Sequence, residues 1–427
     1  MNRAIYRVAS WVAEPFMPLI LKPRRSLGKE PAERFPERLG HAGKPRPDGP
    51  LMWVHAASVG ESLSVLPLIA RLTANHPKLN VLITTGTVTS AALIAERLPP
   101  RALHQFVPVD TPAAVRRFLD HWRPDAALWV ESELWPNLLA ALDRRHITRT
   151  LVNGRMSAGS FARWRYLLGT VRGMIAGFAV CLAQTEADAE RFAELGARNA
   201  RFVGDLKAVA DLPEAEPAAL AALSAAIAGR PVWIAASTHE GEEALALRVH
   251  RRLESGAPGL LSVIVPRHPV RGDQIVAELE GLGAKVARRS RGELPDAQTA
   301  VFLGDTMGEM GLYLKLGSVV FVGKSLLHDG GHNPREPARL GRAVLFGPGM
   351  TNFVDAAAAL TVAGAAIEVA DEDSLAEAVA DLLADPAKCQ AMGDAAMAIA
   401  EREAAGVLDR VEAALMPIAE FLGDARA

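Results

Sequence analysis

Carboxylate side chains follow two of the apolar runs in the N-terminal half of the chain. Glu61 lies in the stretch Ala57-Ser58-Val59-Gly60-Glu61-Ser62, where a glycine turn joins a predicted strand to a predicted helix. A carboxylate at the ligand edge of a sheet could remove a proton from a substrate as a general base. A glutamate in the first turn of a helix also stabilises the helix dipole. The local pattern leaves both roles open for Glu61.

A second acidic segment, Glu131-Ser132-Glu133-Leu134-Trp135-Pro136-Asn137, follows the fourth predicted strand. If this segment is extended, Glu131 and Glu133 share one side of it, because side chains alternate along a strand. Two carboxylates so close raise the pKa of at least one of them, which favours acid–base chemistry. The adjacent Trp and Pro indicate a sugar site rather than a solvated surface. The hydroxyls of Thr-Thr-Gly-Thr at residues 84–87 could bind sugar or phosphate at another strand end.

In the C-terminal half, a Gly-rich turn at residues 328–332 separates an apolar strand from a predicted helix start. Asn333 is the predicted cap, Pro334 the first helical residue and Glu336 the third residue after the cap. This arrangement leaves free backbone N–H groups and the positive end of a helix dipole at the strand end, where a phosphate can bind. Glu336 could be the return arm of a capping box, or it could bind the ribose hydroxyls of a nucleotide.

Three other strand ends in this half carry polar residues. Ser237-Thr238-His239-Glu240 and Thr306-Met307-Gly308-Glu309 both have the spacing of a capping box. Arg267-His268 places two nitrogen donors after a strand. Because all of these segments follow strands of one predicted sheet, their convergence predicts a nucleotide pocket. Asp371-Glu372-Asp373 resembles an acidic triplet that carries a metal–diphosphate, but its place before a helix is better explained by capping.

Two arrays of alternating strands and helices are predicted to position these residues. Short apolar runs recur from Leu51 to Asp205 and from Val232 to Asp371, which is typical of doubly wound parallel sheets. The predicted fold class is α/β, with two Rossmann-like domains facing a central cleft. The predicted parts are an N-terminal segment with an irregular connection, the two domains and a C-terminal helix that crosses back, at residues 1–50, 51–211, 212–403 and 404–427. A Pro- and Glu-rich hinge is predicted at residues 211–217.

Composition excludes several classes of protein. Half of the 427 residues are hydrophobic, and the net charge of −2 argues against a dedicated nucleic-acid binder. Cys181 and Cys389, the two cysteines, fit a reducing cytosol and exclude a disulfide scaffold. The histidines show no His-Glu-x-x-His pattern, and the two glycines between His328 and His332 argue against a helical metal pair. The sequence therefore predicts no metal site.

The first 21 residues form an amphipathic segment with aromatic side chains. No uncharged run in it reaches the ~18 residues that a membrane-spanning helix needs, and no secretory cleavage site follows. A basic flank of Lys22, Arg24, Arg25 and Lys29 comes next. Such a segment suits the surface of an anionic membrane. The alternative is a helix that packs on its own domain.

An apolar stripe also runs through the arginine-rich residues 144–172. It predicts either a contact with a membrane or acidic lipid, or a core helix with a basic outer face. The members of the stripe are Phe161, Trp164, Leu168, Val171 and Ile175.

Eight segments occur in order as HAASVGES, ITTGTVTS, ESELWPNLL, NGRMS, ASTHEGEE, PRHP, GDTMGEMGLYL and FVGKSL…GGHNPREP. With them the chain resembles, over about residues 1–425, the 3-deoxy-D-manno-octulosonic acid (Kdo) transferases of lipopolysaccharide synthesis. The resemblance implies a GT-B architecture and an inverting transfer of Kdo from CMP-Kdo to the lipid A precursor lipid IVA. It also implies residence at the cytoplasmic side of the inner membrane.

The same resemblance implies roles for individual residues. Glu61 in VGES matches the family's catalytic base, and Glu131 in ESELWP and Lys207 in GDLK match positions that stabilise the transition state. The segments that match CMP contacts are Arg267-His268, Gly308-Glu309-Met310 and Asn333-Pro334-Arg335-Glu336. Pro337 departs from the Ala-rich continuation usual in the family, which predicts a slightly shifted helix start.

The donor's chemistry agrees with these implications. Because CMP-Kdo carries a single phosphate, cations and helix N-termini can stabilise the leaving CMP without a metal or other cofactor. One alternative is a GT-B transferase or epimerase that uses a nucleoside-diphosphate sugar. The other is a two-domain sugar-binding protein without enzymatic activity.

Overall fold

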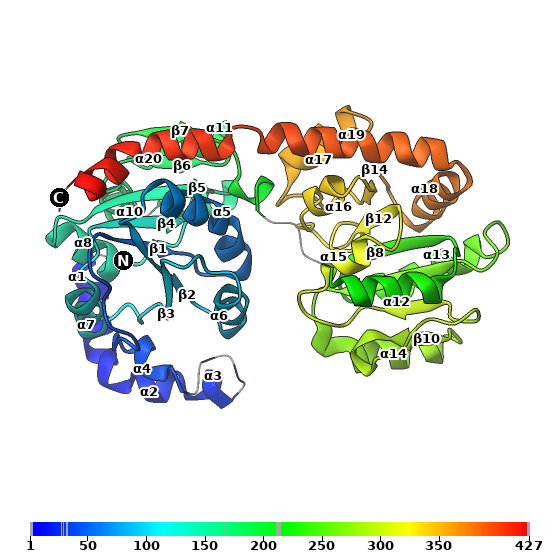
Figure 1. The fold of residues 1–427 in the computed structure, drawn as a ribbon, viewed down its shortest axis with the longest axis horizontal. Helices are drawn as coiled ribbons and strands as arrows, with labels where there is room; N and C mark the ends of the chain where they lie inside the picture. The colour runs from blue at the N-terminus through cyan, green and yellow to red at the C-terminus, as the bar shows by residue number, and fades with distance from the viewer. Residues whose placement is uncertain are drawn as a thin grey trace. The chain divides into compact units, whose positions relative to one another are not determined.

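The computed structural model describes residues 3–26, 28, 30, 33–166, 168–210 and 215–424. Lys29 and residues 211–214 of the predicted hinge lie outside the described residues. The chain divides into two compact units (Figure 1). Unit 1 comprises Met1–Asp211 and Ala404–Ala427, and unit 2 comprises Leu212–Glu403.

Unit 1 is built on a seven-stranded parallel sheet with the order β3-β2-β1-β4-β5-β6-β7. The central strands are buried along their whole length, because helices cover both faces of the sheet. The strands are β1 (Leu51–His55), β2 (Asn80–Thr85), β3 (Ala102–Phe106), β4 (Ala126–Val130), β5 (Thr148–Gly154), β6 (Cys181–Ala183) and β7 (Ala200–Phe202).

Aromatic side chains fill the core of unit 1 on one face of this sheet. The Trp53 ring lies 4.8 Å from the Phe118 ring and 5.2 Å from the Trp129 ring, between centroids. The helices of unit 1 beyond residue 30 are α4 (Phe35–Arg38), α5 (Val59–Asn75), α6 (Val88–Ala95), α7 (Pro112–Trp122), α8 (Pro136–Arg144), α9 (Ala158–Arg165), α10 (Leu168–Ile175), α11 (Glu186–Glu194), the short 3-10 turn η2 (Leu206–Ala208) and α20 (Val407–Asp424).

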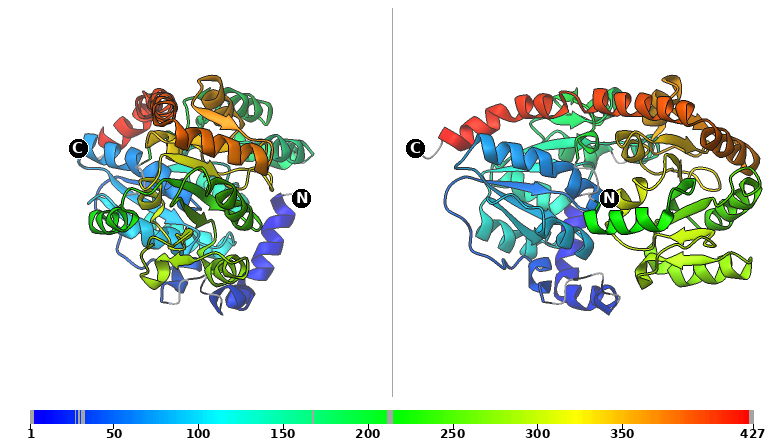
Figure 2. Two further views of the ribbon diagram at one scale, coloured as in Figure 1. Left: turned by 90° about the vertical axis from the view of Figure 1, so that its right-hand side faces the viewer. Right: turned by 45° about the vertical axis from the view of Figure 1, so that its right-hand side comes forward.

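The last helix, α20, packs on unit 1 beside α5 (Figures 1 and 2). Val407, Val411 and Leu415 are buried in the core between them. Arg71 of α5 forms an ion pair of 2.6 Å with Glu412 of α20. The end of the chain is therefore part of the first unit, although about 190 residues of unit 2 precede it.

Unit 2 contains a second seven-stranded parallel sheet, with the order β10-β11-β9-β8-β12-β13-β14. Its strands are β8 (Val232–Thr238), β9 (Leu261–Pro266), β10 (Val286–Arg288), β11 (Val301–Leu303), β12 (Val319–Val322), β13 (Ala343–Phe346) and β14 (Ala366–Glu368). Its helices are α12 (Pro217–Ile227), α13 (Glu242–Leu253), α14 (Gly272–Gly281), α15 (Met310–Leu314), α16 (Arg335–Arg339), α17 (Val354–Val362), α18 (Glu372–Ala384) and α19 (Pro386–Ala404).

The predicted fold class is confirmed, because both units are Rossmann-like and every predicted strand is present. Asp371 caps α18 in a capping box with Ser374, which confirms the capping interpretation of the acidic triplet. The apolar stripe of residues 161–175 is divided between α9 and α10. Val171 and Ile175 are buried in the core, which agrees with the core-helix alternative.

The N-terminal segment forms α1 (Arg3–Ala13), the 3-10 turn η1 (Glu14–Phe16), α2 (Met17–Ile20) and α3 (Lys22–Ser26). The helix α1 packs on α7 and α8, and Asn137 Nδ2 donates to Ser10 Oγ at 2.8 Å. Glu14 accepts a bond of 3.0 Å from the Ala113 N–H. The opposite face exposes the apolar side chains of Ile5, Val8, Trp11, Val12, Phe16, Leu19 and Ile20. None of the helices in the described part of the chain is long and apolar enough to span a membrane.

Candidate active site

The strand order of each sheet creates a place where ligands bind in open α/β folds. In unit 1 the order reverses between β1 and β4, and in unit 2 between β8 and β12. The connections that leave two such strands run in opposite directions, so that a crevice opens at their carboxyl ends. Glu61 and Glu131 follow β1 and β4, and His239 and Lys324 follow β8 and β12. The chemistry-bearing residues of both units are therefore at these switch points.

Glu61 is held at the start of α5 by hydrogen bonds to Ser58 and Ala57. Ser58 is the N-cap, and its hydroxyl oxygen accepts a bond from the Glu61 N–H at 3.4 Å. The Glu61 carboxylate accepts bonds from the Ser58 hydroxyl at 2.7 Å and from the Ala57 N–H at 2.8 Å. The residue is 7% exposed, and burial, followed by the charge of Glu131, raises its pKa to about 7. The same carboxylate thus stabilises the turn that precedes the helix and can exchange a proton near neutral pH.

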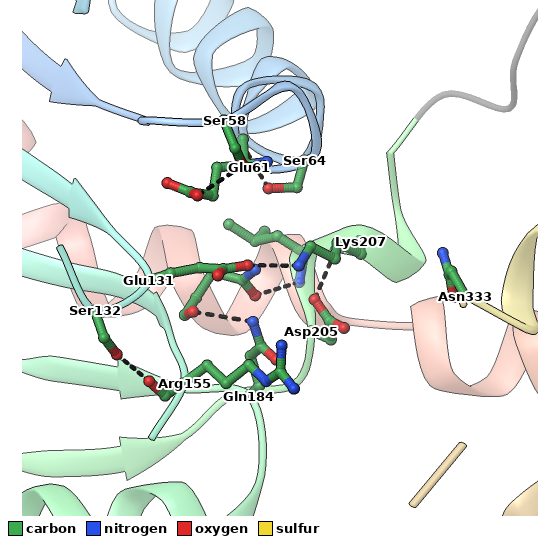
Figure 3. Close-up of polar contacts among 12 residues, drawn as sticks. Ser58, Glu61, Ser64, Glu131, Ser132, Arg155, Gln184, Asp205, Lys207 and Asn333 are labelled. Atoms are coloured by element: carbon green, nitrogen blue, oxygen red, sulfur yellow. Dashed lines mark hydrogen bonds and ion pairs between the residues drawn. The ribbon is translucent and has the colours of Figure 1, made fainter. Parts of the chain in front are cut away.

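Glu131 and Lys207 form an ion pair close to Glu61 (Figure 3). Lys207 Nζ lies 2.5 Å from Glu131 Oε1, and Figure 3 shows the two side chains pointing toward one another. A Cβ added to Gly60 would lie 3.9 Å from Lys207 Cε, so Lys207 passes beside the first turn of α5. The fold therefore brings the three candidate catalytic residues of unit 1, Glu61, Glu131 and Lys207, close together. Each of them follows a strand of the same sheet.

Glu131 and Glu133 do not lie in an extended run, so the condition under which they would share one side is not met. Glu131 has a φ of +58°, and the chain turns at residues 131 and 132. A non-glycine residue in this left-handed region is uncommon and costs on the order of 1–3 kcal/mol, and such residues cluster at functional sites. The expected rise in pKa does occur at Glu133, where burial is the largest cause and the charge of Glu131 adds to it.

Asn153, in the NGRMS segment, positions the backbone that carries Lys207. Asn153 is fully buried at the end of β5 with a φ of +52°, and its Oδ1 accepts a bond of 2.8 Å from the Leu206 N–H. Asp205 caps the same turn by accepting a bond of 2.9 Å from the Lys207 N–H. Gln184 Nε2 donates to the Asn153 carbonyl at 3.1 Å. The sequence offered NGRMS only as a family motif, because Asn153 and Leu206 are 53 residues apart.

The threonine hydroxyls at residues 84–87 are used inside the fold, contrary to the predicted role in ligand binding. Thr84 Oγ1 accepts a bond of 2.9 Å from the Trp53 indole N–H and lies 3.0 Å from His55 Nδ1. Thr85 Oγ1 lies 2.9 Å from His104 Nε2. The hydroxyl of Thr87 caps α6. These hydroxyls stabilise the strand ends and the helix start instead.

In unit 2, histidines and cations gather at the carboxyl ends of β8, β9 and β12. His239 Nε2 and His332 Nε2 are 2.9 Å apart, and the two ring planes are inclined by 21° with centroids 5.2 Å apart. The His268 ring lies 5.7 Å from the His239 ring. Burial is the largest cause that lowers the pKa of His239 to about 4 and of His332 to about 3, and Lys324 and Arg267 add to it. Both imidazoles are therefore neutral at pH 7.

The sequence predicted Arg267 and His268 at this place, but the contact of His239 with His332 and the position of Lys324 were missed. Lys324 has a φ of +59°, and Ser237, in the adjacent strand β8, has a φ of +57°. The available signal was the pair of glycines before His332. A Cβ on Gly331 would lie 2.4 Å from Met350 Sδ, so a side chain at this position would prevent the loop from packing against Met350. Among the residues that the structure describes, no group of three or more His, Cys, Asp or Glu side chains could hold a metal ion.

The predicted capping box at Ser237–Glu240 is wrong, because α13 begins later. Its N-cap is Gly241, and the helix starts at Glu242. Glu242 Oε2 instead accepts bonds from the His239 N–H at 2.9 Å and from the Lys324 N–H at 2.8 Å. This buried carboxylate therefore joins the loops that follow β8 and β12.

The predicted capping box at Thr306–Glu309 is also wrong. The helix α15 begins at Met310, and the N-cap Glu309 makes no cap bond with its side chain. The Arg289 guanidinium donates to Glu309 Oε1 at 2.6 Å, and the Thr306 hydroxyl donates to Glu309 Oε2. Gly308 has a φ of +82° and open space around it, so a ligand could approach this backbone.

The helix that follows the Gly-rich turn begins one residue later than predicted. Its N-cap is Pro334, and α16 starts at Arg335. Asn333 Oδ1 accepts a bond of 3.2 Å from the Arg335 N–H, and Asn333 Nδ2 lies 3.4 Å from Glu336 Oε1. Glu336 is thus engaged by the Asn333 side chain, and burial raises its pKa. Arg335 is paired with Glu403 of α19.

Two doubly wound α/β units with charged residues at their switch points define a glycosyltransferase fold of the GT-B class. Residues 33–210 match the sequence model described as 3-deoxy-D-manno-octulosonic-acid transferase (kdotransferase). The chain is 38% identical over 414 residues to the 3-deoxy-D-manno-octulosonic acid transferase of Bordetella pertussis, which covers 93% of this chain and 95% of the relative. It therefore belongs to the family of Kdo transferases and is a glycosyltransferase.

A second relative agrees with this assignment, and a solved structure agrees with the fold. The 3-deoxy-D-manno-octulosonic acid transferase of Haemophilus influenzae is 33% identical over 395 residues, which cover 91% of this chain and 92% of the relative. The UDP-GlcNAc 2-epimerase of Neisseria meningitidis, solved with UDP-GlcNAc bound, is similar with a TM-score of 0.58. The match covers 86% of this chain and 99% of the epimerase at 13% identity, and it supports the fold alone.

Proposed function

We propose that the protein transfers Kdo from CMP-Kdo to a hydroxyl group of lipid IVA in lipopolysaccharide synthesis, with Glu61 as the general base. The observation that carries this proposal is the buried Glu61 carboxylate, with a pKa near 7, next to the pair of Glu131 and Lys207. An alcohol has a pKa far above 7, so a positioned base contributes roughly 10²–10⁴-fold to the rate.

In the proposed step, Glu61 takes the proton of the acceptor hydroxyl, and the oxygen of that hydroxyl forms a bond to the anomeric carbon of Kdo. The bond from that carbon to the phosphate oxygen breaks, and CMP leaves with the electron pair. Attack on the face opposite to CMP inverts the configuration. Glu131 stabilises positive charge on the sugar, and Lys207 stabilises negative charge on the leaving group.

The proposed donor site lies in unit 2 and contains Arg267, His268, the backbone at residues 308–310 and residues 333–336. The open backbone at Gly308 and the side chain of Arg267, which has no hydrogen-bond or ion-pair partner among the described residues, support this proposal. A single leaving phosphate is a charge that these cations can neutralise, so we expect transfer to need neither a metal nor another cofactor.

The proposed acceptor, lipid IVA, is held in a membrane, and the protein is expected at the cytoplasmic side of the inner membrane. The exposed apolar face of α1 to α2 supports this placement, because a monomeric soluble protein seldom exposes so many large apolar side chains together. The basic flank at Lys22, Arg24 and Arg25 is suited to anionic lipid.

The test is mass spectrometry of lipid IVA after incubation with the purified full-length protein and CMP-Kdo, with a chelator present. The expected result is a mass gain of one or more Kdo residues, which the Glu61→Gln protein produces roughly 10²–10⁴-fold more slowly. An unchanged acceptor in the presence of intact CMP-Kdo and folded protein would overturn the proposal. Transfer from a uridine-diphosphate sugar would then identify the alternative donor.

A further inference from the structure

We propose that His239 and His332 form a proton-sharing pair that opens to bind an anionic group of the donor and takes up a proton as it does so. The identity of the ligand rests on the proposed function, whereas the proton chemistry follows from unit 2 alone. The feature that carries the inference is the 2.9 Å separation of the two Nε2 atoms.

The close approach of the two nitrogens limits how many protons the pair can hold. Only one proton fits between them, so one imidazole donates and the other accepts. The pair can therefore carry at most one additional proton, on the outer nitrogen of the donating ring, while this contact persists. A second additional proton would place two N–H groups against each other. Full protonation of the pair requires the contact to open.

The groups around the pair also oppose its protonation. Arg267 and His268 approach from the end of β9, and Lys324 and His328 approach from the loop after β12. Burial is the largest cause that holds both pKa values well below 6.5. Lys324, Arg267 and His268 add to it at both rings, and His328 adds to it at His239. They leave the ligand-free pair neutral at pH 7.

The nearby carboxyl groups of the described residues make no hydrogen bond or ion pair with the side chains of this cluster, although the charge of Arg267 lowers the pKa of Glu336 against the larger effect of burial. Glu242 Oε2 is committed to the backbone N–H groups of His239 and Lys324, and the Glu336 carboxyl is engaged by the Asn333 side chain. No carboxylate of the described residues bonds to either imidazole or pairs with Lys324. His239, Lys324 and His332 are half-buried, and Arg267 and His268 are exposed, so this cluster of cations and imidazoles is open to an incoming anion.

An anion that binds here changes the protonation of the pair. A negative charge within hydrogen-bond distance favours imidazolium and raises the pKa of each ring, and it offers both Nε2 atoms an acceptor in place of one another. The phosphate and the sugar carboxylate of CMP-Kdo share this chemistry. Because the pKa is higher in the complex than in the free protein, affinity is greatest at low pH and falls as pH rises through the bound-state pKa.

The experiment is isothermal titration calorimetry of the full-length protein at pH 7 with CMP and with CMP-Kdo, without acceptor. Each titration is repeated in two buffers that differ in ionisation enthalpy, so that the difference in heat gives the number of protons taken up. We expect uptake of a sizeable fraction of a proton or more for wild type, and little uptake with several-fold weaker binding for His332→Asn and for His239→Asn. His146→Asn, at an exposed position in unit 1, is the matched control and should keep the uptake.

Comparison of CMP with CMP-Kdo shows whether the phosphate or the sugar carboxylate binds to the histidine pair. Uptake with CMP as well as CMP-Kdo assigns the phosphate to the pair, and uptake with CMP-Kdo alone assigns the carboxylate. Tight binding of CMP-Kdo with no proton uptake, or equal uptake by both folded variants, would overturn the inference and leave the transferase function intact. A failure of wild type to bind CMP-Kdo would overturn the proposed donor as well.

Discussion

Lys207 Nζ lies 2.5 Å from Glu131 Oε1, and the charge of Glu131 is a cause of the raised pKa of Glu61. These residues come from η2, from the end of β4 and from the start of α5, so three separate elements must be in place before they interact. The positive charge of Lys207 partly cancels the negative charge of Glu131, so it reduces the effect of Glu131 on the pKa of Glu61. Burial is the largest cause of the raised Glu61 pKa, and the ion pair adjusts it, so substitutions at Glu131 and Lys207 should have opposite and measurable effects.

Replacement of Glu61 by Gln should lower kcat by roughly 10²–10⁴-fold, because the amide cannot accept the proton of the acceptor hydroxyl. The Gln oxygen can still accept the bond from the Ala57 N–H, so the start of α5 and the binding of CMP should be retained. Initial rates from mass spectrometry and calorimetric titration with CMP measure the two quantities. The exposed Glu96→Gln is the control and should be fully active. Rapid turnover by a folded Glu61→Gln protein would remove Glu61 from the role of base.

Substitutions in the ion pair should shift the pH–rate profile in opposite directions. Lys207→Met leaves the Glu131 charge uncompensated and should move the acidic limb to higher pH, whereas Glu131→Gln removes the charge and should move it to lower pH. A displacement of one pH unit corresponds to about 1.4 kcal/mol. Both variants should also lose kcat. Profiles of kcat measured from pH 5 to 9 test this, and shifts of the same sign would show that the pair does not act on Glu61 through its charge.

The sequence was sufficient to predict the two sheets but not the ion pair of Glu131 and Lys207. Strands such as β1 and β4 are buried on both faces, so each appears as a continuous apolar run that can be recognised locally. The left-handed turn at Glu131 and the bond from Leu206 to Asn153 depend on parts of the chain distant in sequence, and no local pattern indicates them. The same reason explains the misplaced capping boxes: α13 begins after Gly241 and not at the predicted Ser237–Glu240 box, and the Glu309 carboxylate bonds to Arg289, 20 residues away.

Asn153 offers a test of how Lys207 is positioned. Asn153→Gly keeps the left-handed backbone without strain but removes the acceptor of the Leu206 N–H, whereas Asn153→Asp keeps an acceptor oxygen. The Gly variant should lower kcat and move the acidic limb to higher pH, as Lys207→Met does. Its effect should be smaller than additive when combined with Lys207→Met, because both changes act on one interaction. The Asp variant should restore much of the wild-type profile.

A residue with a purely structural role would behave differently in this experiment. Asn153→Gly would then reduce the thermal midpoint and the fraction of active protein, but the limb of the profile would stay in place. Full additivity with Lys207→Met would lead to the same conclusion. Thermal unfolding of each variant, followed by circular dichroism, separates these outcomes.

The exposed apolar face of α1 should be required for association with anionic lipid. Val8→Asp combined with Trp11→Asp changes two side chains that are more than half exposed, so the fold should be unaffected. Burial of a large apolar side chain contributes about 1.5–3 kcal/mol, so the double variant should bind vesicles at least tenfold more weakly. Sedimentation with phosphatidylglycerol-containing vesicles measures this. Val362→Asp, at a 90% exposed site in unit 2, is the control and should bind as wild type does. Equal sedimentation of all three proteins would contradict the predicted membrane surface.

The raised pKa of Glu61 predicts that activity and stability change in opposite directions with pH. The base must be ionised, so kcat should rise as pH increases through about 7. The folded-state pKa of about 7 lies above the ordinary value of 4.5, so the folded protein binds more protons than the unfolded chain between these values. The stability contributed by protonated Glu61 is complete below pH 4.5 and is lost as pH rises through 7, on the order of 3 kcal/mol. Glu61→Gln cannot ionise, so its thermal midpoint should exceed that of wild type at pH 8 and approach it at pH 5. A wild-type protein that gains stability relative to Glu61→Gln as pH rises from 5 to 8 would show that the Glu61 pKa is not raised by burial, and the rise of kcat near pH 7 would then need another titrating group.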